Sequence, residues 1–184
     1  MSVQRARRRF TVDEYHRMAE AGILSEDDRV ELIEGEIVDM TAIRGSHLDC
    51  VNRLTRLLVT RVGARADVSV QNPIRLDRYS EPQPDLALLH PRPYAPDLPG
   101  PRDVFLLVEV ADTSAAYDRQ VKVPLYARAG ILEVWLVDLE GQAVEVYREP
   151  APAGYRNAQA FARGQQLSPL AFPEVVLTVD EMLG

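Results

Sequence analysis

The sequence has almost no cysteine and no long apolar run. Its single cysteine, Cys50, cannot form an internal disulfide. No apolar stretch is long enough for a membrane-spanning helix or for the apolar region of a signal peptide. We therefore expect a cytoplasmic protein without membrane contact. A length of 184 residues fits a single domain, 1–184, with one core.

The chain also lacks the short motifs of several enzyme classes. No P-loop, GxGxxG or GxSxG motif occurs, so sites of those types are not supported. The three histidines lack HExxH spacing, and one cysteine cannot build a zinc cluster. Both observations argue against a zinc site.

Positive charge is scarce. The formal net charge is −7 and the pI is about 5.0, which argues against a broad basic surface for nucleic acid. A metal-dependent enzyme acting on phosphodiesters is still compatible with this charge, because its site is acidic until the ion arrives. The candidate phosphate contacts are the basic N-terminal segment 1–10, which we expect to be flexible, and Arg53, Arg56 and Arg61.

The first half of the chain predicts two helices and two short strands. TVDEYHRMAEAG predicts a helix in which Thr11 and Glu14 form a capping pair. RVELIEGEIVDM predicts two strands joined by a turn at its central EG. A second helix is expected over 46–62, because apolar residues recur there at helical spacing. These apolar residues are Leu48, Val51, Leu54, Leu58 and Val62.

The second half predicts a sheet interrupted by one helix. AAYDRQVKVPLYARAG predicts that helix, and TVDEML predicts a short capped helix at the C-terminus. We expect an α/β (α+β) fold, a mixed central β-sheet flanked by helices. The runs 104–110 and 131–138 are nearly continuous in apolar residues, which predicts that they are the central strands. The predicted strands are 66–76, 85–90, 104–110, 131–138 and 142–149.

Two carboxylates stand at the ends of apolar strand runs. Asp85 begins DLALLH, and Glu109 lies near the end of VFLLVEV. Consecutive strands are usually neighbours, so both side chains can face one pocket. Oxygen ligands of this kind suit Mg²⁺ or Mn²⁺. Alone, Glu109 is equally explained by a structural ion pair or by a strand end that reaches solvent.

A lysine lies on the segment that returns over the sheet. Asp118, Lys122 and Tyr126 recur at i, i+4 and i+8, so they share one face if that segment is helical. A cation beside two carboxylates and a metal can hold a phosphate and an attacking water. Taken singly, Lys122 reads as a solvated helix residue, and His47 as a capping or core-edge histidine.

Several segments together resemble a known family. PQPDLALL, LLVEVADTS and YDRQVKVPLYARAGILEVWLVD resemble the Uma-two family of restriction-endonuclease-like proteins. RVELIEGEIVDM, the Ser46-His47 helix start and VSVQNPIRL, which contains Gln71, extend the resemblance from about Thr11 to Tyr147. The resemblance implies the PD-(D/E)XK nuclease fold with a divalent-metal site.

The resemblance also implies roles for individual residues. Asp85 matches the Asp of the PD element and Glu109 the next acidic residue, and the Val110 carbonyl would join them on the metal. The expected lysine two residues after Glu109 is Ala111 here, and Lys122 matches the lysine that replaces it in the Uma-like group. The auxiliary positions are Glu31 or Glu34, between which the sequence does not choose, and His47, Gln71, Asp118 and Tyr126.

Two functions follow from the resemblance. The first is a Mg²⁺- or Mn²⁺-dependent endonuclease that cuts DNA, for which a homodimer would be the simplest way to cut both strands. The second is an inactive nuclease-derived domain that binds nucleic acid or a protein partner.

Pro124 predicts that the regular helix starts near Val123, which would place Lys122 at a helix N-terminus and lower its pKa. We therefore expect Lys122→Ala to leave folding nearly unchanged.

Overall fold

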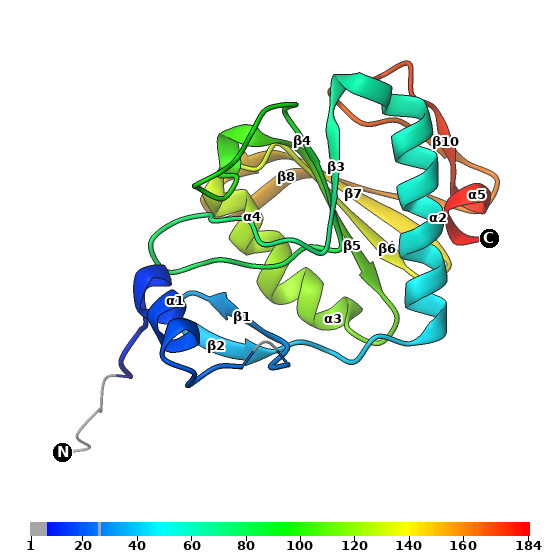
Figure 1. Ribbon diagram of the computed structural model, residues 1–184. Coiled ribbons are helices and arrows are strands. Elements are labelled where there is room, and N and C mark those ends of the chain that lie inside the picture. The colour runs from blue at the N-terminus through cyan, green and yellow to red at the C-terminus, as the bar shows by residue number, and fades with distance from the viewer. Residues whose placement is uncertain (1–6, 26) are drawn as a thin grey trace.

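A six-stranded mixed β-sheet forms the centre of the computed structural model, which describes residues 7–25 and 27–184 (Figure 1). The strands lie in the order β3-β4-β5-β6-β7-β8, and all neighbours are antiparallel except the parallel pair β5 and β6. The predicted fold class is confirmed. The sheet strands are β3 (Asp67–Val70), β4 (Leu86–Leu89), β5 (Val104–Ala111), β6 (Glu133–Asp138), β7 (Ala143–Ala151) and β8 (Gly154–Ala162). The α-helices are α1 (Val12–Glu20), α2 (Gly45–Val62), α3 (Ala115–Tyr117), α4 (Val123–Ala129) and α5 (Val179–Leu183).

Alternation along β5 decides which helical layer each of its side chains meets. Leu106, Val108 and Val110 belong to the core that also contains the buried residues of α2 and α5. Leu107 belongs to the second core, under α4, on the opposite face of the sheet (Figure 1). Side chains along a strand alternate with a period of two, so Glu109 falls on the α4 face with Leu107. The charged side chain therefore enters the layer of the crossover helix.

The crossover from β5 to β6 is helical from Ala115 to Ala129, with a change of pitch in its middle. A π-helical turn, η3 (Asp118–Lys122), joins α3 to α4, and the Val123 N–H donates to the Asp118 carbonyl five residues back. Pro124 is the second residue of α4 and directly follows the wider π-helical turn. The α-helix starts at Val123 as predicted, but helical turns precede it, so Lys122 does not lie at a free helix N-terminus.

The N-terminal part packs beside the sheet as a separate unit of one helix and one hairpin. The side chain and backbone of Thr11 and Glu14 cap α1 reciprocally, as predicted. The predicted hairpin is β1 (Val30–Ile33) paired with β2 (Glu36–Asp39), and Leu32 forms a bridge to Glu81. Residues 1–6 of the expected flexible segment lie outside the described residues. Further along that segment, Arg8 bonds Glu14, and Arg9 bonds the Glu34 carbonyl.

The C-terminal part contains three strands that the sequence did not predict, the long strand β8 and the short strands β9 (Gln166–Leu167) and β10 (Leu177–Thr178). β8 pairs with β7 along the whole strand, yet most of its side chains are exposed. A polar strand without apolar alternation gives no periodic signal, because the backbone ladder alone holds it. The predicted capped helix is α5, where Thr178 and Glu181 form the capping box. The remaining short elements are η1 (Gly63–Arg65) and η2 (Pro101–Asp103).

One member of the predicted apolar stripe on α2 points to solvent. Leu48 is 50% exposed, whereas Leu54 and Leu58 are fully buried. At about 100° per residue, Leu48 lies about 120° from Leu54 around the helix axis, while Cys50 lies only about 40° away. Cys50 takes the buried position, so the expectation for Leu48 was wrong.

Within the described residues, no helix is both long enough and apolar enough to cross a membrane.

We expect Leu58→Ala to lower the free energy of unfolding by about 2–5 kcal/mol, because it removes a buried side chain from the α2 core. Leu48→Ala is the matched control on the same helix and should change stability by less than about 0.5 kcal/mol. Urea denaturation measures both. Equal losses for the two variants would contradict the placement of the α2 stripe.

Candidate active site

A pocket of about 400 Å³ gathers the three principal residues of the predicted site. Asp85 directly precedes β4, Glu109 lies on β5, and Lys122 lies on the π-helical turn. All three line this pocket. The β1–β2 hairpin, the stretch 40–44, the start of α2, Gln83 and the segment 112–118 contribute the other lining residues. Strands β4 and β5 are neighbours, as predicted.

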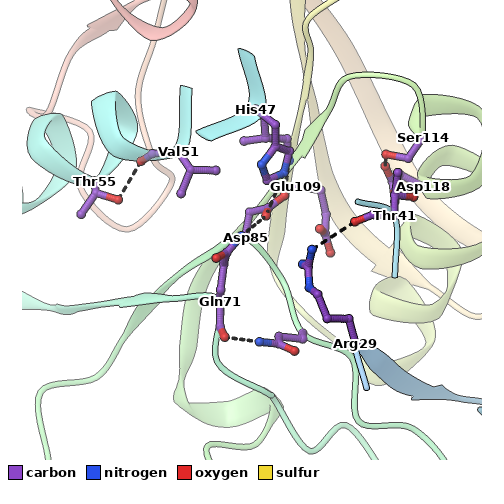
Figure 2. Close-up of polar contacts among 12 residues, drawn as sticks. Arg29, Thr41, His47, Val51, Thr55, Gln71, Asp85, Glu109, Ser114 and Asp118 are labelled. Atoms are coloured by element: carbon purple, nitrogen blue, oxygen red, sulfur yellow. Dashed lines mark hydrogen bonds and ion pairs between the residues drawn. The ribbon is translucent and has the colours of Figure 1, made fainter. Parts of the chain in front are cut away.

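Asp85 is held by donors from three directions. Its Oδ1 lies 3.0 Å from His47 Nε2 and 3.2 Å from Gln71 Nε2, and its Oδ2 accepts the Val110 N–H at 2.8 Å. Figure 2 shows His47 and Gln71 approaching this carboxylate. The hydrogen bond to Asp85 raises the pKa of His47. Gln71 adopts a left-handed backbone with φ 51°, and its N–H donates to the Asp85 carbonyl. Asp85 is therefore fixed in one orientation.

Glu109 is buried and shares one oxygen between two donors. Its Oε1 lies 3.3 Å from Lys122 Nζ and accepts the Tyr126 hydroxyl at 2.5 Å. Burial raises the pKa of Glu109 to about 8, although the charge of Lys122 acts in the opposite direction. The neighbouring carboxylates Asp118, Asp85 and Glu31 add to the increase. Without a bound cation, Glu109 therefore holds its proton more strongly than an exposed glutamate does.

Lys122 bridges two strands. Its Nζ lies 3.1 Å from Glu31 Oε2 and 3.3 Å from Glu109 Oε1, and the residue is only 6% exposed. Burial by itself lowers the pKa of Lys122, but Glu109, Glu31 and Asp118 outweigh it, and the net shift is upward. The predicted lowering of this pKa was wrong, because the lysine faces carboxylates instead of the N–H groups of a helix start.

The structure chooses between the two early glutamates. Glu31, on β1, is buried at the pocket, and its Oε2 also accepts the Gln83 N–H at 3.1 Å. Glu34 lies in the hairpin turn, is exposed, and pairs with Arg128 at 3.0 Å. Glu31 is therefore the early acidic residue of the candidate site.

Asp118 and Tyr126 differ in position, because Asp118 lines the pocket and Tyr126 lies in the core. Asp118 lines the pocket and accepts the Ser114 hydroxyl at 2.7 Å, and burial raises its pKa (Figure 2). Tyr126 is fully buried in the α4 core and contacts the site through Glu109. Tyr126 thus holds Glu109 by a hydrogen bond from the core side and does not line the pocket.

Two of the three α2 arginines expected to contact phosphate have other partners. Arg53 donates to the carbonyls of Met182 and Leu183, and Arg61 pairs with Glu181. Both hold α5 against α2, which corrects the expectation from the sequence. Figure 2 shows Arg29 donating to the Thr41 carbonyl, at 3.5 Å. The pocket residues that the sequence did not reveal are Arg29, Arg44, Gln83, Ser114 and Tyr117.

The donor set fits a hard divalent ion. A carboxylate offers about four lone-pair positions, and Asp85 uses three. Oε2 of Glu109 accepts no hydrogen bond from the described residues. The Val110 carbonyl lies on the same strand edge as its N–H, which points to Asp85. The described residues contain no group of three or more His, Cys, Asp and Glu arranged for a metal. Two carboxylates and one carbonyl with waters suit Mg²⁺.

The raised pKa of Glu109 predicts a pH-dependent stability in the presence of a chelator. The folded state keeps the Glu109 proton to about pH 8, whereas the unfolded chain releases it near 4.5. Between these values the folded state binds more protons, so stability decreases as the pH rises. The free energy of unfolding of wild type, relative to Glu109→Gln, should fall by a few kcal/mol across this window. The exposed Glu34→Gln is the matched control, and a flat difference for Glu109→Gln would contradict the burial effect.

Comparisons with known proteins identify a family and a shared fold. The family model Uma2, described as "Putative restriction endonuclease", matches residues 12–180. Among solved structures, the chain is similar to the crystal structure of "a putative nuclease belonging to DUF820 from Anabaena variabilis ATCC 29413". That match has a TM-score of 0.74 and 19% identity, and covers 95% of this chain and 97% of the other. A comparison with curated proteins finds no match.

At 19% identity the solved structure shows the shared fold, and the family rests on the family model. The residues that resemble the Uma-two family, including the PD element and the Lys122 segment, all lie within the matched range 12–180. The chain therefore belongs to the Uma2 family, described as "Putative restriction endonuclease".

Proposed function

We propose that this protein is a Mg²⁺- or Mn²⁺-dependent endonuclease that hydrolyses DNA phosphodiester bonds. The observation that supports the proposal most is the convergence of Asp85, Glu109 and Lys122 on one pocket from three separate elements. A structural ion pair would explain why Glu109 and Lys122 are buried together. It would not explain why Asp85 lies at the same pocket and is held there by three donors. Cutting both strands of DNA would be simplest for a homodimer.

Each residue has a distinct task in this proposal. Asp85, Glu109 and the Val110 carbonyl would hold the ion, with Asp85 fixed by His47 and Gln71. When bound, the ion supplies a positive charge that stabilises the developing charge on the phosphate and lowers the pKa of water. Lys122 stays protonated because carboxylates raise its pKa. It therefore acts as a fixed charge that orients water or phosphate, and not as a base.

The proposal predicts loss of cleavage when Asp85 or Lys122 is changed. Asp85→Asn and Lys122→Ala should remove the nicking of plasmid DNA in Mn²⁺, because the first removes a charged ligand of the ion and the second removes the fixed positive charge beside the phosphate. Arg156→Ala, on the exposed strand β8 and outside the pocket, should cut like wild type. Gel electrophoresis measures nicking over time. Equal cutting by wild type and Lys122→Ala would refute the role of Lys122, and binding without cutting by wild type would favour the inactive domain.

Burial changes the stability expected of Lys122→Ala. The substitution leaves Glu31 and Glu109 without their shared cation, which should lower the free energy of unfolding by about 3–5 kcal/mol. This replaces the expectation of unchanged folding. Cleavage should therefore be compared at a temperature at which circular dichroism shows both proteins folded.

Metal binding should stabilise the folded protein. An ion that binds only the folded state raises stability by about 2.7 kcal/mol at a concentration of 100 Kd. Mg²⁺ or Mn²⁺ at millimolar concentration should raise the Tm of wild type and of Asp97→Asn, an exposed control, but not that of Asp85→Asn. Differential scanning fluorimetry measures the shift. An equal shift in all three proteins would place the ion elsewhere.

A further inference from the structure

The candidate catalytic groups line a partly open pocket and are themselves almost fully buried. Glu109 is 3% exposed, Lys122 is 6% exposed, and the Asp85 side chain is 13% exposed. The volume of about 400 Å³ falls within the range of roughly 300–1,000 Å³ that is typical of small-molecule pockets. A reacting phosphate must therefore enter the pocket to reach these side chains.

A regular duplex does not suit such an entry. Its phosphates lie on a stiff backbone, and each nucleotide is stacked and paired with its neighbours. Extruding one nucleotide from a paired duplex costs a few kcal/mol, and the cost is smallest where the strand is already unpaired. The depth of Glu109 and Lys122 thus favours a flexible strand over the interior of a duplex.

The lining of the pocket includes several apolar side chains and one aromatic ring. Val38 and Met40 come from the end of the β1–β2 hairpin, and Ile43, which is 41% exposed, comes from the irregular stretch before α2. Tyr117, at the end of α3, lines the same pocket and is half-buried. Unpaired bases stack on aromatic rings with little regard to sequence. These side chains offer a surface for a base above the carboxylates.

The charge of the pocket sets a condition on binding. Two exposed arginines, Arg29 and Arg44, line it and can contact a phosphate. The pocket contains more carboxylates than cations, even when Lys122 is counted with the two arginines. A phosphate therefore enters favourably only when a divalent ion offsets the negative charge. The carboxylates that line the pocket are Glu31, Asp39, Asp85, Glu109, Asp112 and Asp118.

We propose that this site accepts an unpaired nucleotide, so that its substrate is single-stranded or locally opened DNA and not intact duplex. The base lies against Tyr117 and the apolar wall, and the phosphate lies between the arginines and the ion. This inference rests on the proposed nuclease function and names the substrate class of the same site.

Binding measurements with three related DNA probes test the inference. The probes are one labelled oligonucleotide, its perfect duplex, and a duplex with a central unpaired bubble. In Ca²⁺, fluorescence anisotropy of wild type should show binding to the single strand and to the bubble at least about tenfold tighter than to the duplex, because only they present unpaired bases. A chelator should abolish the preferential binding. Equal affinity for strand and duplex would overturn the inference.

Variants of the wall separate base stacking from a general charge effect. Tyr117→Ala should weaken single-strand binding about tenfold through loss of the ring, whereas the matched Tyr117→Phe should keep it. Ile43→Ala gives a second test on an exposed residue that is not needed for folding. Leu132→Ala removes an apolar side chain that is 56% exposed and lies outside the pocket, and the variant should bind like wild type. Loss of affinity in Leu132→Ala equal to that in the wall variants would contradict the proposed stacking.

Cleavage of the same probes in Mn²⁺ distinguishes the two proposals. Cutting of the strand and the bubble at rates well above that of the duplex supports both. Cutting of all three at one rate overturns the inference on the substrate but leaves the endonuclease standing. Selective binding of unpaired DNA without any cutting leaves the inference standing and overturns the endonuclease.

Discussion

The buried ammonium of Lys122 is the interaction on which the site depends. It joins Glu31 on β1 to Glu109 on β5, and so ties the N-terminal hairpin to the central sheet. Within the described part of the chain it is the only buried cation, and its neighbours carry more negative charge than it can balance. The excess shows in the raised pKa of Glu109, which burial and the surrounding carboxylates maintain. A divalent ion would relieve the same excess, which supports the proposed metal dependence.

The π-helical turn at Asp118–Lys122 places that ammonium. Pro124 cannot donate to a carbonyl one turn earlier, and the wider turn avoids the clash while the chain stays helical into α4. Arg119, within the same turn, binds Asp138 and Glu145 on β6 and β7. The turn is therefore clamped to the sheet on one side while Lys122 reaches the pocket on the other. A residue of irregular pitch is thus held as firmly as one in a regular helix.

An acidic composition is compatible with the proposed nucleic-acid substrate because attraction and chemistry would share one metal-dependent pocket. The overall charge of −7 repels DNA at long range, and Arg53 and Arg61 are occupied with holding α5. Attraction of the DNA would be confined to the pocket, where a metal ion would change the local charge from negative to positive. Such a protein would depend on its ion for binding as well as for cutting, and its contact with DNA would be short.

The sequence by itself determined the main elements, the central pair of strands and the identity of Asp85, Glu109 and Lys122 as a set. Capping residues, apolar periodicity and family motifs are local signals, and they survive without coordinates. The tertiary structure decided what those signals leave open. It chose Glu31 over Glu34, because the β1 strand points one inward and the turn exposes the other. It also buried Cys50 in place of Leu48, added the polar strand β8, and raised the pKa of Lys122. Each of these depends on which side chains from distant segments meet, and the order of residues along the chain does not record that.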